Sequence, residues 1–66
     1  MARYQILTRL MVTPRPMAIG EADTPAEAVR LARGFTAQGR RDVQIGDNEA
    51  SQHFPTEEFA AKHGVR

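Results

Sequence analysis

The stretch from residue 22 to 39 most constrains the fold of this chain, because it carries the start, the apolar face and the end of one helix. Thr24 and Glu27 have the three-residue spacing of a capping box, and Pro25 suits the first helical position. The apolar residues that follow at helical spacing are Ala28, Leu31, Ala32 and Phe35. Gly39 is a natural stop. The pattern predicts a helix that buries one face made of small and apolar side chains.

Short segments with alternating apolar residues predict strands on both sides of this helix. They cover residues 3–12, 17–21, 42–46 and 50–54. Pro14 and Pro16 separate the first two strands, because proline lacks a backbone N–H and restricts the residue before it. In the second strand we expect Met17 and Ile19 to point inward.

A second helix is expected over residues 57–63. Thr56 can cap its start, and Gly64 ends it, with Val65 folded back onto the last turn. The inner positions of this helix are expected to be Phe59, Ala60 and His63.

The resulting element order, ββαββα, predicts a single α+β domain over residues 1–66. We expect a small single-layer sheet, antiparallel or mixed, with the helices on one face. The expected core consists of Tyr4, Ile6, Leu10, Ile19, Leu31, Phe35, Val43, Ile45, Phe54 and Phe59.

The size of the chain favours association with a second copy. A domain of 66 residues buries only about 60% of the surface that its unfolded chain exposes. The sequence has no cysteine, so disulfides and cysteine-ligated zinc sites do not add stability. We therefore expect a homodimer. The lack of a signal peptide or of a run of about 20 apolar residues indicates a cytoplasmic protein without membrane contact.

The first hairpin contains the candidate interface. Leu7 and Met11 fall on the face of the first strand opposite its more uniformly apolar side. They are either covered by another chain or exposed. With Met17 and Ile19, these residues are the predicted contacts for a second copy or for another protein.

Arginines form a second candidate surface. The chain contains eight arginines and one lysine, with a net charge of +3 over residues 1–45 and −2 over residues 46–66. Arg30 and Arg33 are neighbours on the predicted helix, and Arg40 and Arg41 follow its end. These four residues are candidates for phosphate contacts to nucleic acid. Glu27 and Asp42 are close enough in sequence to pair with them, so a solvated basic face is the simpler interpretation.

The remaining polar residues do not form a recognisable catalytic or metal motif. His53 and His63 flank Glu57 and Glu58, but their spacing is not that of HExxH. Ser51 lies two residues before His53, which by itself is weak evidence for nucleophilic catalysis. A chain of this length also has little room for a cleft of the usual ~300–1,000 Å³, except at a subunit interface. We therefore predict no enzyme activity, no catalytic residues, no cofactor and no metal.

One local resemblance involves the start of the chain. Tyr4 and Ile6, followed by Asp23-Thr24 and Glu27-Ala28 at the helix start, resemble the opening of HicB-like antitoxin domains. In that family a strand pair precedes a helix that begins with a similar stretch. The resemblance implies a regulatory role, and no functional residue is transferred from it.

The sequence thus predicts a non-enzymatic protein-interaction module that self-associates. The alternative is a nucleic-acid-binding or regulatory, antitoxin-like module that uses the basic helix face.

Overall fold

The computed structural model describes residues 2–9 and 16–65, and its four strands form one antiparallel sheet. The order across the sheet is β2-β1-β3-β4, so the first and third strands in sequence are central neighbours. The strands are β1 (Tyr4–Arg9), β2 (Pro16–Ala22), β3 (Gln44–Asp47) and β4 (Gln52–Pro55). The expected ββαββα order is confirmed, and the sheet is antiparallel rather than mixed.

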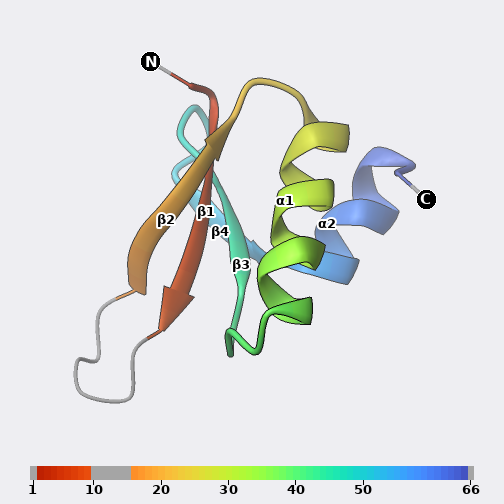
Figure 1. Cartoon of the computed structure of the whole chain (residues 1–66). Coiled ribbons are helices and arrows are strands. Elements are labelled where there is room, and N and C mark those ends of the chain that lie inside the picture. Colours follow the sequence, from red (N-terminus) through yellow and green to blue (C-terminus); the bar gives the residue numbers. More distant parts are fainter. Residues whose placement is uncertain (1, 10–15, 66) are drawn as a thin grey trace.

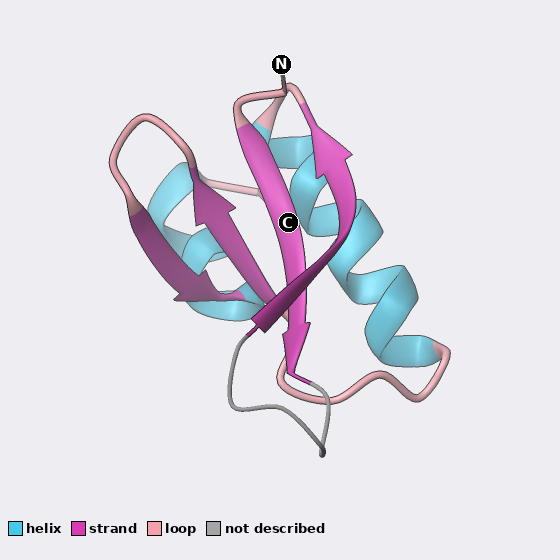
Figure 2. Cartoon of the chain, turned by 90° about the vertical axis from the view of Figure 1, so that its left-hand side faces the viewer, coloured by secondary structure: helices cyan, strands magenta, loops and turns pink. Residues whose placement is uncertain are grey.

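Two helices, α1 (Pro25–Ala37) and α2 (Thr56–His63), cover one face of this sheet (Figure 1). In a view turned by a quarter turn, the four strands lie in front and both helices lie behind them (Figure 2). The molecule therefore has two layers, and its core lies between them. Within the described residues, neither helix is long and apolar enough to cross a membrane.

The predicted start of α1 is confirmed. The hydroxyl of Thr24 accepts a hydrogen bond from the Glu27 N–H at 3.2 Å, and Pro25 is the first helical residue. Past the helix end, Gly39 has a φ of 95°, which glycine adopts without strain. The buried face is wider than predicted, because α1 contacts α2 as well as the sheet, and Val29 is buried there.

The start of α2 differs from the prediction. The residue before the helix is Pro55, and no side chain caps the first turn. Thr56 is the first helical residue, and its buried hydroxyl donates to the carbonyl of Val43 at 3.1 Å. Its hydroxyl is thus used to anchor α2 to the chain before β3, because that carbonyl is buried and needs a donor.

The predicted end of α2 is confirmed. Gly64 is left-handed, with a φ of 66°, and the Val65 N–H donates to the carbonyl of Ala60 at 2.8 Å. Val65 packs against the core. This hydrogen bond and the apolar contact are typical of a glycine-ended helix.

Strands β3 and β4 begin later than predicted, because a bend and a turn, respectively, occupy the first residues of each predicted strand. Asp42 has a positive φ of 52°, so β3 begins two residues later than predicted. The Asp47 carboxylate accepts hydrogen bonds from the N–H groups of Glu49 and Ala50, which makes residues 48–51 a turn and delays β4. The predicted end of the first strand, residues 10–12, lies outside the described residues.

Strand β2 carries a bulge. Gly20 pairs with Ile6 and Ala18 pairs with Leu7, so Ile19 between them has no partner on β1. Ile19 packs against the core, as expected. Met17, also expected to point inward, is instead 49% exposed near the start of this edge strand.

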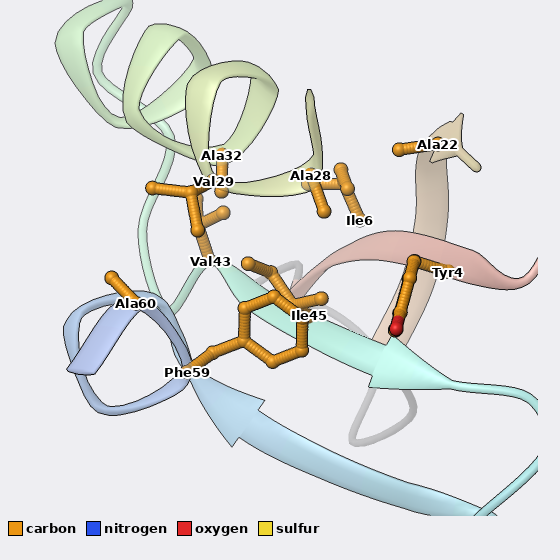
Figure 3. Close-up of a cluster of buried hydrophobic side chains, with 10 residues drawn as sticks. All are labelled: Tyr4, Ile6, Ala22, Ala28, Val29, Ala32, Val43, Ile45, Phe59 and Ala60. Carbon is orange, nitrogen blue, oxygen red and sulfur yellow. The ribbon is translucent and has the colours of Figure 1, made fainter. Parts of the chain in front are cut away.

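The core combines two aromatic rings with smaller aliphatic side chains from the sheet and from both helices (Figure 3). Its buried members are Tyr4, Ile6, Ala22, Ala28, Val29, Ala32, Val43, Ile45, Phe59 and Ala60. Four of the other predicted core residues are half-buried against this cluster: Ile19, Leu31, Phe35 and Phe54. Leu10 lies outside the described residues. The expected inner position of His63 is exposed, although its ring packs 4.3 Å from the ring of Phe59.

Candidate functional site

An open groove lies on the helical layer of the described structure. It has a volume of about 570 Å³ and lies between α1 and the chain that follows α2. We call it the helix groove. Its apolar lining is Ala26, Val29 and Val65, and its polar lining is Thr24, Glu27, Arg30 and Arg33. The groove is open to solvent along the helical layer rather than enclosed.

Local structure explains why these residues meet. Ala26, Val29, Arg30 and Arg33 recur every three or four residues, which places them on one side of α1. Val65 reaches the same place because the left-handed Gly64 turns the chain back over the end of α2. Sequence reasoning identified Arg30 and Arg33 as neighbours and Val65 as folded back over α2. It missed the apolar surface of Ala26 and Val29, and it did not connect the two segments.

One wall of the helix groove is held by an ion pair between the helices. Arg33 Nη2 donates to Glu57 Oε1 at 2.9 Å, and Arg33 Nε donates to Glu57 Oε2 at 3.2 Å. This hydrogen bonding, with a smaller contribution from Coulomb attraction, raises the pKa of Arg33 and lowers the pKa of Glu57 from their ordinary values. Arg33 thus has its anionic partner within the chain.

Arg30 and Glu27 face solvent along the same groove. Arg30 is exposed and Glu27 is half-buried. Within the described part of the chain, neither side chain forms an ion pair within 4 Å. Besides the paired Arg33, the groove therefore presents one cation and one anion, a single helical turn apart, beside an apolar surface.

The four arginines predicted to bind phosphate are not equivalent. Arg30 and Arg33 line the helix groove, whereas Arg40 and Arg41 lie in the connection between α1 and β3 (Figure 1). All four are exposed. The backbone of the connection is held by the Thr8 hydroxyl, which donates to the carbonyl of Arg41 at 2.7 Å, and by the Arg40 N–H, which donates to Phe35.

The predicted hairpin interface is covered in part by its own chain. Leu7 is only 5% exposed, although it follows the core residue Ile6 on β1 and therefore lies on the sheet face away from the helices. A Cβ placed on Gly46 would stand 3.3 Å from Leu7 Cδ1 and 3.1 Å from the ring of His53. The missing side chain at Gly46 thus leaves space that Leu7 and His53 fill.

The other predicted contacts of the hairpin have different surroundings. Ile19 is half-buried against the core, and Met17 is exposed. Met11 lies outside the described residues. Of the described members of this set, Met17 is therefore the one that presents a large apolar surface to solvent.

The two edge strands are poor templates for adding another strand. Strand β2 begins at Pro16 and is interrupted by the bulge at Ile19. Strand β4 has four residues and ends at Pro55. Short strands, bulges and prolines are the devices by which proteins prevent edge-to-edge pairing. This geometry favours contacts through side chains over contacts through strand edges.

The histidines lie at separate places. His53 is on β4, and His63 is at the end of α2 beside the rings of Phe59 and Tyr4. Ser51 is in the turn before β4, with a positive φ of 53°. Over residues 2–9 and 16–65, no three His, Cys, Asp or Glu side chains are grouped as a metal ion requires.

No protein-family model matches the chain, and no curated protein or solved structure matches it. The resemblance to the opening of HicB-like antitoxin domains therefore depends only on the residues at the start of the chain and of α1.

Proposed function

We propose that this chain is a non-enzymatic protein-interaction module that self-associates as a homodimer in the cytoplasm. The observation that carries the proposal is the helix groove, which offers apolar surface from Ala26, Val29 and Val65 beside two charged residues, Glu27 and Arg30, without an ion partner in the described chain. An open groove of this kind suits a protein surface, because it combines apolar burial with charges that select the partner.

The small core supports self-association. Four of the ten buried core residues are alanines, and the sheet is covered by helices on one face only. Alanine contributes little apolar area, so the core supplies less stabilisation than a core of larger side chains would. Burial against a second copy adds to the stability of such a domain.

The first hairpin is the other location for the contact. Its described candidate is Met17, since Leu7 and Ile19 are already covered by their own chain. Exchange of Met17 for glutamine tests this location, because that change removes apolar surface from an exposed position without touching the core.

The test of the proposal is sedimentation of the purified chain from low micromolar to submillimolar concentration. We expect a reversible change from monomer to dimer. NMR amide shifts recorded over the same concentrations should map the contact. A chain that sediments as a compact, folded monomer over the whole range, and that captures no protein partner, would overturn the proposal.

A second function, binding of nucleic acid, is favoured by the exposure of the arginines. Arg30, Arg40 and Arg41 are exposed and form no ion pair within the described residues. Phosphate contacts would give an affinity that falls steeply with salt concentration. A titration with short DNA and RNA at low and physiological salt tests this function, and a double change of Arg40 and Arg41 to glutamate should weaken binding on every sequence alike.

A further inference from the structure

The exposed side of α1 carries its charges in two blocks. Asp23 precedes the helix and Glu27 lies in its first turn, whereas Arg30 and Arg33 occupy the following turns. All of these residues except the half-buried Glu27 are exposed. The acidic block is thus at the N-terminal end and the basic block follows it, so a surface with the reverse order would complement it.

We propose that α1 of a second copy packs antiparallel across the helix groove, so that Glu27 of each protomer faces Arg30 of the partner subunit. This inference depends on the proposed self-association and identifies the surface that carries it. A two-fold axis between Glu27 and Arg30 generates both ion pairs at once, because a two-fold contact uses the same patch on each copy.

The electrostatics of the groove select a second copy as its occupant. Besides Arg33, which is paired with Glu57, the groove presents one anion and one cation a single turn apart. A uniformly acidic segment would meet Glu27, and a uniformly basic segment would meet Arg30, so each would suffer like-charge repulsion. The same helix in the opposite direction carries both charges at the matching spacing. Antiparallel helices also align their dipoles favourably.

The shape of the groove is compatible with this contact. Ala26 is exposed and small, and Val65 gives apolar surface at the opposite side of the groove, so a neighbouring helix can approach α1 closely. Arg33 is held in place by Glu57. Because that pair is already satisfied within the chain, the intermolecular ion pairs are assigned to Glu27 and Arg30.

A charge-exchange experiment tests the pairing. Arg30→Glu and Glu27→Arg each place like charges at both contacts, and we expect each change to weaken dimerisation at least about tenfold. The double variant Glu27→Arg/Arg30→Glu restores opposite charges with the order reversed. Its dissociation constant should return to within about threefold of the unmodified chain if the two residues face each other, since a paired effect of this size reports direct coupling.

Two further variants separate the contact from general effects. Arg40→Glu makes the same charge change outside the groove and should leave the dissociation constant unchanged. Ala26→Gln adds bulk to the groove at an exposed position without changing charge, and it should weaken dimerisation even if Glu27→Arg lowers helix stability. Circular dichroism and thermal unfolding of each variant establish that it is folded.

The outcomes distinguish this inference from the proposed function. If the unmodified chain never dimerises, self-association itself is wrong, and the surface assignment falls with it. If it dimerises and neither Arg30→Glu nor Ala26→Gln changes the dissociation constant, self-association stands and the groove is not its surface. If the single variants weaken the dimer and the double variant does not recover, the pairing of Glu27 with Arg30 is wrong.

Discussion

Arg33 and Glu57 form a two-pronged ion pair that joins α1 to α2 across 24 positions of sequence, with hydrogen bonds of 2.9 and 3.2 Å. The planar guanidinium matches both carboxylate oxygens, so the pair fixes direction as well as distance. Arg33, one of the four arginines predicted to bind phosphate, is thus engaged in a contact between the two helices. It also holds one wall of the helix groove in place.

The pH dependence of this ion pair follows from the lowered pKa of Glu57. Hydrogen bonding to Arg33 lowers the pKa of Glu57 below its ordinary value of 4.5. A carboxyl whose folded pKa is lowered stabilises the fold fully above its unfolded pKa, and this contribution is lost as the pH falls through the folded pKa. Glu57→Gln should therefore reduce the Tm slightly at pH near 7, and the difference should disappear in acid below the folded pKa of Glu57.

Glu58 is the matched control for that measurement, because it is also an exposed glutamate in the first turn of α2. Glu58→Gln keeps the Arg33–Glu57 pair and shares the helix-dipole effect. Thermal unfolding of both variants across the acid range separates the two contributions. An equal Tm difference at neutral and acid pH for Glu57→Gln would contradict the role of the ion pair.

The buried hydroxyl of Thr56 is expected to act as an anchor and not as a helix cap. Thr56→Val leaves the carbonyl of Val43 without its donor, which should cost about 1–3 kcal/mol of unfolding free energy. Thr56→Ser keeps the hydroxyl and should cost less. An aspartate would serve as well as threonine at a true cap, but here it would bury a charge. Urea unfolding of the three variants distinguishes the two roles of the hydroxyl. A Thr56→Asp variant as stable as the natural chain would contradict its role as an anchor.

Two glycines should respond to alanine in opposite directions. Gly34 is a solvent-exposed residue within α1, away from the helix ends, and a Cβ there would meet no atom within 4 Å. Gly34→Ala should raise the unfolding free energy by about 0.5–1 kcal/mol, because alanine loses less conformational entropy in a helix. Gly64 has a φ of 66°. Gly64→Ala should lower the unfolding free energy by about 1–2 kcal/mol, since L-residues are strained in that conformation. Changes of the same sign, measured by urea unfolding, would contradict the assigned backbone geometry.

Two isoleucines, one at the centre of the sheet and one at the bulge, test how the core is packed. Ile45 on β3 has no exposed surface, whereas Ile19 on β2 is half-buried. Ile45→Val should cost about 0.5–1.5 kcal/mol, because it leaves unfilled space in a packed interior. The same change at Ile19 should cost less, since solvent reaches its site. Equal losses of unfolding free energy for the two variants, measured in urea, would contradict the position of Ile45 at the centre of the core.

Local patterns were sufficient to predict the elements and their order. Thr24, Pro25 and Gly39 mark the limits of α1 through hydrogen bonds and backbone preferences that involve only nearby residues. Gly64 marks the end of α2 in the same way. The boundaries of β3 and β4 were less exact, because Asp42 and the Asp47 turn change the backbone direction without altering the apolar pattern.

The sequence by itself therefore determined the four strands, the two helices and most of the core, since each depends on the spacing of side chains along one segment. Only the tertiary structure decided which segments meet. It brought Val65 to α1, paired Arg33 with Glu57, turned the Thr56 hydroxyl to Val43 and covered Leu7 beside Gly46. These contacts join residues far apart in sequence, and their partners depend on strand order and helix placement, which no local spacing encodes.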